Sequence, residues 1–388
     1  MNNRNLIVLI VFLLAFLTGV NFVIFPSLGT AFTDAFLFGL SSSQFGNLFI
    51  PQVICIIVAC LGAPVLVNKW GPKIVLAVGI VLMLISTGSL WFLHYFLAEK
   101  AMLFLVLMVL VAFTGTGFGL SITTLNPLAA SLFEKGSAKA ILILQFLVGL
   151  GTSTSPLMMN LIGDPKNWMY LPGSIFVTVV VVLIVFLFLK IEKGSFFKLP
   201  GHFRIPEKLW VFFIAIIFYG CVEGTFGSFG GIILKNKGLD NGEASIGLSL
   251  FWAGIALNRL LFGIFSKMVD LSLVFLCAPI AVAITIVLLL VYPDVHLLVF
   301  MMFMIGFFMG SIFPGSIGWG TVEFPTYSVL VSGFLMAANQ IGTGVVTNVL
   351  GRFSDHLNEV LQILVVLMTI ISTLFFYLKR NSKIKDAF

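Results

Sequence analysis

Long apolar runs separated by short polar connections make up most of the chain. A helix needs about 20 apolar residues to cross a hydrocarbon core about 30 Å thick, and twelve runs of about this length are present. They cover residues 6–28, 44–67, 73–93, 102–126, 138–162, 168–189, 209–234, 244–266, 271–292, 297–320, 327–351 and 359–378. The pattern predicts an all-α membrane protein with twelve transmembrane helices.

The composition agrees with this prediction and excludes several classes of protein. The 388-residue chain is 60% hydrophobic and 9% charged, whereas a soluble domain carries about 25% charged residues. The four cysteines lie in apolar runs, without the spacing of metal ligands or of a disulfide framework. The sequence contains no phosphate-binding glycine loop, no nucleophile motif and no His/Glu metal spacing. We therefore expect neither an enzyme nor a nucleotide-driven pump, with no cofactor and no bound metal.

The charges in the loops predict an orientation in the membrane. When both termini are placed on one side, that side collects 15 of the 21 Lys and Arg residues, the other side holds five, and Arg259 lies inside a helix. By the positive-inside rule, this bias places both termini in the cytoplasm, and we expect a multi-pass protein of the bacterial inner (plasma) membrane. The net charge of +6 then reflects topology, and no nucleic-acid partner is expected.

The longest connection divides the chain near its middle. Residues 191–208 are basic and contain two prolines, which predicts a cytoplasmic linker between an N-terminal six-helix bundle, 1–190, and a C-terminal one, 209–388. The two halves are expected to repeat one another. Corresponding runs share glycine-rich cores, which are Gly115/Gly119 with Gly306/Gly310, and residues 145–151 with residues 339–344.

Two charges lie deep inside apolar runs. Glu223 and Arg259 occupy the seventh and eighth runs, where a charge costs about 2.5–3.5 kcal/mol on insertion scales. Such residues mark pathway or coupling sites by default. Burial favours the neutral form of a carboxyl group, so Glu223 could carry a proton, and Arg259 could bind a substrate carboxylate. Alternatively they only neutralise each other, although their heights differ by about 9 Å at 1.5 Å per residue, which is awkward for a direct contact.

The loop after the second run reads PVLVNKWGPK, residues 64–73. It resembles the loop signature of the major facilitator superfamily, G-x-x-x-[DN]-[RK]-x-G-[RK]-[RK], and prolines replace its leading glycine and one basic position. The matching residues are Asn68, Lys69, Gly71 and Lys73. Lys69 suits a helix C-terminus, where the dipole favours a cation, and Gly71 permits a tight turn. The resemblance implies two six-helix halves that rock around a central site, with this loop as a conformational element. An ordinary positive-inside loop is the alternative.

The seventh and eighth runs carry a more specific resemblance. The segments YGCVE at 219–223, and FWAG at 251–254 followed by Asn258-Arg259, resemble the fucose and glucose/galactose permease branch of that superfamily. The resemblance implies a proton-coupled symporter for a sugar-like solute. The chain departs from the branch at Phe22, where an acid is usual, and in the fourth run, which contains no acid. Glu223 is left as the candidate for proton coupling.

Polar residues inside other runs are candidates for the lining of a central cavity. The preferred ones are Asn21, Gln145, Trp252, Asn339 and Gln340. They fall in helices one, five, eight and eleven, which surround the cavity in the superfamily that the chain resembles. Such residues can instead serve as polar contacts between helices, since amide and small side chains hold membrane helices together.

Together these features predict a secondary active transporter that moves a small polar organic solute by alternating access. Proton-coupled uptake of a sugar-like or carboxylated solute is the first expectation. An exporter of a drug-like compound, or of a metabolite such as a carboxylate or siderophore, is the alternative, and a non-transporting membrane receptor on the same fold is the second. The expected partners are a small-molecule substrate, protons and the lipid bilayer, and the chain is expected to be a monomer.

Overall fold

A computed structural model describes residues 3–96, 100–132, 137–191, 206–265, 271–292, 294–324, 328–353 and 356–381. Within these ranges the chain forms helices and no strand. The first group of long helices is α1 (Asn3–Phe22), α5 (Phe49–Trp70), α6 (Pro72–Phe92), α7 (Lys100–Ser131), α8 (Ser137–Ile162) and α9 (Tyr170–Phe188). The second group is α10 (Glu207–Asn236), α11 (Asn241–Phe265), α12 (Leu271–Val291), α13 (Val295–Met309) continued by α14 (Ile312–Glu323), α15 (Ser328–Arg352) and α16 (Leu357–Asn381). Short helices connect them: α2 (Ile24–Ser27), α3 (Gly29–Thr33), α4 (Ser42–Asn47), η1 (Leu93–Phe96) and η2 (Pro165–Asn167).

These helices confirm the predicted fold class. Among the described residues, ten helical segments are long and apolar enough to cross a membrane, and α13 and α14 together make one of them. The two other long helices, α8 and α15, complete the predicted set of twelve. The protein is therefore an all-α membrane protein.

The first predicted helix is shorter than its apolar run. The pattern predicts one helix over residues 6–28, but α1 ends at Phe22 and the chain continues through the short helices α2 and α3. Pro26 has no N–H group to donate to the carbonyl of Phe22, four residues earlier. Proline therefore interrupts the helix while the apolar run goes on.

The tenth predicted helix is also interrupted. The pattern predicts one helix over residues 297–320, whereas α13 and α14 are separated at Gly310 and Ser311. Pro314 lies four residues after Gly310 and has no N–H group to donate to its carbonyl. The break leaves the Gly310 carbonyl oxygen available to a donor from another helix.

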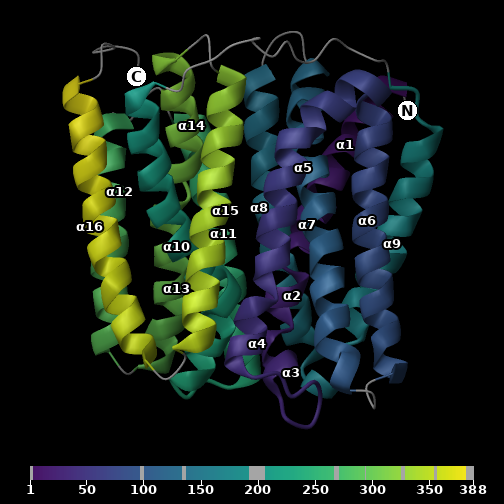
Figure 1. The fold of residues 1–388 in the computed structure, drawn as a ribbon, viewed down its shortest axis with the longest axis horizontal. Coiled ribbons are helices and arrows are strands. Elements are labelled where there is room, and N and C mark those ends of the chain that lie inside the picture. Colours follow the sequence, from purple (N-terminus) through teal and green to yellow (C-terminus); the bar gives the residue numbers. More distant parts are fainter. Residues whose placement is uncertain are drawn as a thin grey trace.

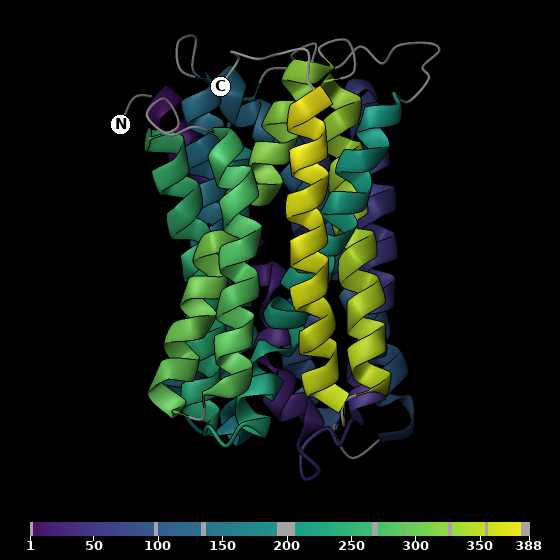
Figure 2. The same cartoon turned by 90° about the vertical axis from the view of Figure 1, so that its left-hand side faces the viewer.

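The long helices stand side by side in two groups (Figure 1), with α1 and α5–α9 on one side and α10–α16 on the other. The start of α1 and the end of α16 lie at one end of the bundle, called the termini end here, and α3 and α4 lie toward the opposite, far end. Figure 2, turned by 90°, shows the second group upright between these two ends. The seam between the groups is formed by α8 packed along α11 and α5 packed along α15.

At the far end, the two groups are in direct contact. Gly46 of α4 lies so close to α15 that a Cβ atom there would overlap the carbonyl group of Thr347. Beside it, the side-chain amide of Asn348 donates a hydrogen bond to Oδ1 of Asn47 (2.6 Å). These contacts join α4 to α15 and close the far end between the groups.

Glycines bring α1 and α8 to backbone contact within the first group. A Cβ atom at Gly19 of α1 would overlap the backbone of Val148, and one at Gly151 of α8 would overlap the backbone of Phe16. Only a residue without a side chain permits this approach. Small residues at such interfaces are the usual way in which membrane helices pack closely.

The same arrangement recurs in the second group. A Cβ atom at Gly220 of α10 would overlap the backbone of Asn339, and one at Gly342 of α15 would overlap the backbone of Ile217. The spacing along each helix matches as well. In both pairs, a helix carries its glycine three residues after the residue whose backbone the glycine of the other helix approaches. The pair α10 and α15 is therefore the counterpart of the pair α1 and α8.

A second pair of helices repeats as the sequence predicts. Glycines of α7, and glycines in and just after α13, face α5 and α11 at equivalent places, which are Gly115 at Gln52, Gly119 at Ile56, Gly306 at Phe251 and Gly310 at Ile255. These recurring contacts are those expected of a repeat. The boundaries at 1–190 and 209–388 stay a prediction, since most of the linker 191–208 lies outside the described residues.

The glycine contacts predict a specific pattern of stability. Gly151→Ala and Gly342→Ala are each expected to lower the free energy of unfolding by about 1–3 kcal/mol, because the added methyl group overlaps a backbone carbonyl. Gly62→Ala in α5 is the matched control: its Cβ atom would have no neighbour within 4 Å, and alanine favours a helix over glycine. Thermal unfolding of the purified protein in detergent compares them. Equal losses at Gly62 and Gly342 would contradict the account.

Candidate functional site: a buried ion pair beside a central cavity

Glu223 lies midway along α10 with both carboxylate oxygens hydrogen-bonded. The hydroxyl group of Tyr219, one turn earlier on the same helix, donates to Oε1 (3.1 Å). The side-chain amide of Asn339, on α15, donates to Oε2 (2.8 Å). Tyr219 is fully buried. A buried carboxylate is costly unless it is paired and hydrogen-bonded, and α10 and α15 together provide these bonds.

Arg259 of α11 supplies the opposite charge. Its Nη2 atom lies 3.9 Å from Oε1 of Glu223, and the two side chains are only 13% and 12% exposed. Its Nε–H group donates to the carbonyl oxygen of Gly310 (3.4 Å). That carbonyl is free because Pro314 follows it by four residues. The helix break between α13 and α14 thus creates an acceptor that orients the guanidinium group toward Glu223.

The helix heights left open whether these two charges meet, and the structure places them in contact. A difference of about 9 Å in height at 1.5 Å per residue makes a direct contact awkward, yet the two groups meet. Side chains on a helix lean toward its N-terminus, and the consecutive helices α10 and α11 run in opposite directions. Glu223 therefore leans toward the termini end and Arg259 leans away from it, so the side chains approach each other.

A cavity between the two groups of helices lies beside Glu223. Its empty volume is about 420 Å³, including the part open to solvent. The lining residues come from α1, α2, α5, α10, α11 and α15, and one of them, Val23, lies between α1 and α2. They are Phe22, Val23, Pro26, Gln52, Val53, Glu223, Gly224, Gly227, Ser228, Trp252, Gln340 and Thr343. Both groups of helices thus contribute to one central cavity.

Several polar groups of the cavity lack partners within the described residues. Gln52 and Gln340 are each 5% exposed, line the cavity and form no hydrogen bond with another described residue. The buried Nε1 atom of Trp252 is also without a partner. By contrast, Thr343 already donates to the carbonyl of Gly220 (3.2 Å). Gln52, Gln340 and Trp252 therefore bring uncharged donors and acceptors to the lining of the cavity.

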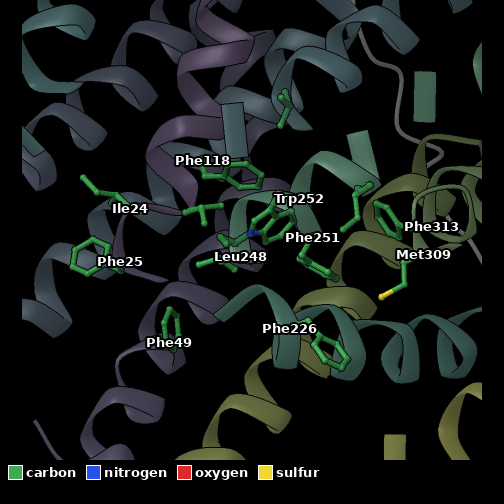
Figure 3. Packing of buried hydrophobic residues seen from close by; sticks show 14 of the residues in the cluster. Ile24, Phe25, Phe49, Phe118, Phe226, Leu248, Phe251, Trp252, Met309 and Phe313 are labelled. Carbon is green, nitrogen blue, oxygen red and sulfur yellow. The ribbon is translucent and has the colours of Figure 1, made fainter. Parts of the chain in front are cut away.

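Aromatic rings form one wall of the cavity. Trp252 meets Phe22 edge to face, with ring centroids 6.4 Å apart, and Phe22 stacks on Phe118 (4.2 Å). Figure 3 shows Trp252 between Phe118 and Phe251. A Cβ atom at Gly227 would lie 2.6 Å from the indole ring, so the glycine leaves the room that the ring occupies. The tryptophan is therefore held in place by packing on several sides.

The predicted lining residues separate into two groups. Trp252 and Gln340 line the cavity, whereas Asn339 points to Glu223. Asn21 is buried and donates to the carbonyl of Leu17 in its own helix (2.9 Å). Gln145 of α8 donates to the side chain of Asn126 of α7 (2.8 Å), which is the contact between helices considered as the alternative. Substrate contact by any of these residues stays a prediction.

Tyr219 and Thr343 also belong to the site, and neither is among the site residues predicted from the sequence. Tyr219 precedes Glu223 by four residues and Thr343 follows Asn339 by four. Residues at this spacing share one face of a helix. The sequence spacing could therefore have placed both beside the buried charge.

The loop predicted as a conformational element has a defined structure. Gly71 ends α5 and precedes α6 with a positive φ of 87°, which explains the glycine in the turn. The ammonium group of Lys69 lies 6.0 Å from the ring of Trp70, and that of Lys73 donates to the Leu187 carbonyl near the end of α9 (2.7 Å). Asn68 is exposed in the last turn of α5. A role in conformational change stays a prediction.

In the described part of the chain, two groups of long helices meet at a central cavity, as in secondary transporters, whose binding sites lie between repeats. Residues 7–347 match the Major Facilitator Superfamily, and the chain belongs to this family. It is 26% identical over 312 residues to the glucose/mannose transporter GlcP of Bacillus subtilis (strain 168), and the match covers 74% of each chain. The predicted family and fold are confirmed: the protein is a multi-pass membrane transporter and not an enzyme.

Solved structures show the same fold. The fucose:proton symporter FucP of E. coli aligns with 96% of this chain and 98% of its own, at 16% identity and a TM-score of 0.63. A D-xylose-proton symporter covers 96% and 97%, at 14% identity and a TM-score of 0.77. A bacterial homologue of the human lysosomal transporter Spinster, in an inward-facing conformation, covers 100% and 99%, at 15% identity and a TM-score of 0.79.

The ion pair predicts non-additive effects of substitution. Arg259→Gln leaves the Glu223 charge unpaired and is expected to cost about 3–5 kcal/mol of stability. The double variant Glu223→Gln/Arg259→Gln removes both charges, so it is expected to be more stable than Arg259→Gln alone. Arg259→Lys keeps the charge and is expected to remain close to the wild type. Thermal unfolding of the wild type, Glu223→Gln, Arg259→Gln and the double variant measures the coupling, and purely additive losses would show that the two charges do not interact.

Proposed function

We propose that the protein is a proton-coupled symporter for a neutral, sugar-like solute. The observation that supports the substrate class is the set of uncharged polar residues that line the cavity, which are Gln52, Gln340 and Trp252. The buried indole N–H group of Trp252 has no partner among the described residues. Amides both donate and accept hydrogen bonds, as sugar hydroxyl groups do. An aromatic wall beside them suits the C–H face of a sugar ring.

A carboxylated solute fits this cavity less well. Arg259 is the cation nearest to it, but Arg259 is not among the described residues that line the cavity. Its guanidinium group is already engaged by Glu223 and by the Gly310 carbonyl. A substrate carboxylate would have to compete with Glu223 for the same cation, and it would approach the negative charge of that residue.

The printed names of similar proteins support the same substrate class. GlcP is a glucose/mannose transporter, FucP is a fucose:proton symporter, and a third protein of the same fold is a D-xylose-proton symporter. Two of the three names include the proton. Nucleoside transport also occurs on this fold, in NupG, so the cavity chemistry carries more weight for the substrate than the fold does.

We propose Glu223 as the proton site. The other acids in the described long helices, Glu207, Glu243, Glu323 and Glu359, lie in first or last turns, whereas Glu223 lies midway along α10 and on the cavity. When ionised, Glu223 attracts Arg259; when protonated, it loses that attraction. A proton therefore changes the contact between α10 and α11 directly beside the bound solute, which is what coupling requires.

Alternating access completes the proposal. The contact between α4 and α15 closes the far end, and the bias of basic residues in the loops favours a cytoplasmic termini end. In that orientation the closed end is extracellular, and reopening it would admit the solute from outside. Uptake across a bacterial inner membrane is the direction that a proton gradient would then drive.

Glu223→Gln separates coupling from transport. The amide keeps the shape of the side chain but cannot ionise, so we expect loss of pH-driven sugar accumulation and retention of exchange between equal concentrations. Proteoliposomes are assayed with the sugar that most raises the unfolding temperature of the wild type in a panel of hexoses and pentoses.

Glu359→Gln, at the exposed start of α16, is the matched control and is expected to accumulate sugar like the wild type. Uphill accumulation by Glu223→Gln at the wild-type level would eliminate Glu223 as the proton site. Loss of both activities from a poorly folded Glu223→Gln protein would assign the residue to charge balance alone.

A further inference from the structure

The outer surface of the first group of helices carries an apolar groove at the termini end. It lies between α6 and α9, and its empty volume is about 760 Å³, including the part open to the surroundings. Its lining residues are Lys73, Ile74, Ala77, Val78, Val81, Leu82 and Leu187. Apart from Lys73, every one of these side chains is aliphatic. The groove is separate from the central cavity and shares no residue with it.

The packing of α6 against α9 explains where the groove lies. Toward the far end, the two helices meet through glycines: a Cβ atom at Gly88 would lie 2.8 Å from the ring of Phe176, and one at Gly173 would lie 3.0 Å from the ring of Trp91. The groove begins beyond these contacts, toward Leu187. The close contacts of these two helices therefore lie toward the far end, and the groove lies toward the termini end.

Basic side chains surround the head of the groove. The ammonium group of Lys73 donates one hydrogen bond to the Leu187 carbonyl (2.7 Å) and keeps two further N–H groups. Lys69 and Lys190 are exposed near the adjoining helix ends, and the exposed ring of Trp70 lies beneath Lys69. The described parts of α5, α6 and α9 contain no acidic residue, so this positive charge is not neutralised by those helices.

We propose that this groove binds an anionic phospholipid. The phosphate group meets Lys73, with Lys69 and Lys190 beside it, and one acyl chain lies along the aliphatic channel. Basic pockets between membrane helices are suited to anionic headgroups, and tryptophan prefers the interfacial depth at which a headgroup lies. The aliphatic groove matches the acyl chain of such a lipid, and the basic side chains match its phosphate group. A soluble anion would contact only the basic side chains, and a neutral lipid would contact only the aliphatic groove.

Lipid binding at this place has a structural consequence. In this proposal the acyl chain lies along the aliphatic residues that line the groove, and the phosphate links the start of α6 to the end of α9. A ligand that binds only the folded protein raises its apparent stability, and the rise grows with the logarithm of ligand concentration relative to Kd. The bound lipid is therefore expected to stabilise the first group of helices, whatever solute the central cavity takes.

The test compares two lipids and several variants of the full-length protein. Delipidated protein in a neutral detergent is titrated with dioleoylphosphatidylglycerol or with dioleoylphosphatidylcholine, and bound lipid is counted by native mass spectrometry while thermal unfolding is followed. We expect saturable binding and a rise in unfolding temperature with the anionic lipid only. Inorganic phosphate at the same concentration is expected to give no rise.

The variants test separately whether lipid binding needs the positive charge and whether it needs the apolar groove. Lys73→Gln is expected to lose most of the lipid-induced rise. Ala77→Phe keeps every charge but fills the channel, and it is expected to lose the rise as well. Lys235→Gln, in the last turn of α10, changes the net charge equally at the far end and is expected to behave like the wild type.

Loss of the bond to Leu187 could lower the stability of Lys73→Gln by itself. The double variant Lys69→Gln/Lys190→Gln keeps that bond and is expected to weaken lipid binding without lowering the stability of the lipid-free protein. Equal responses to the two lipids would overturn the proposal. So would an unchanged response to the anionic lipid in both Lys73→Gln and Ala77→Phe.

Discussion

A carboxylate inside a membrane protein must have partners, and the partners of Glu223 connect much of the second group of helices. Tyr219 on the same helix and Asn339 on α15 donate to its two oxygens. Arg259 on α11 supplies the opposite charge and is itself oriented by the Gly310 carbonyl. Removing any one partner leaves a buried polar group unpaired, so these helices are bound into one polar unit.

Equivalent positions of the repeat carry different side chains in the two groups of helices at the central site. Phe22 and Glu223 lie three residues after the equivalent glycines of α1 and α10, and both line the cavity. Cys60 approaches the Gly119 carbonyl (3.8 Å) just as Arg259 approaches that of Gly310. An aromatic ring and a thiol thus stand in the first group where an acid and a base stand in the second. The charged chemistry of the cavity comes from one half of the repeat only.

Apolar patterning predicts the helices well because every span must satisfy its backbone internally. The breaks at Pro26 and Pro314 could have been predicted as well, since proline lacks the N–H group that each helix needs. The contact of Glu223 with Arg259 could not be obtained from residue heights alone. It depends on the direction in which each side chain leans along its helix.

The sequence also could not predict how each helix is rotated about its axis, and this rotation decides which polar residues face the cavity. Asn339 and Gln340 are neighbours in sequence, yet one bonds to Glu223 and the other lines the cavity. A membrane helix that is apolar on most of its surface does not reveal which face is turned inward. For the same reason the sequence could not separate Gln145, which bonds to Asn126 of a neighbouring helix, from the residues that line the cavity.

The central claim is that protonation of Glu223 and binding of the solute are one linked event. It is tested most directly by the pH dependence of sugar affinity in the purified protein, followed through the intrinsic tryptophan fluorescence to which Trp252 contributes. If the protonated form binds the sugar, wild-type affinity is expected to weaken by about tenfold per pH unit once Glu223 ionises, and Glu223→Gln is expected to bind with no such dependence. A wild-type affinity that does not change with pH, or the wild-type slope retained in Glu223→Gln, would contradict the account.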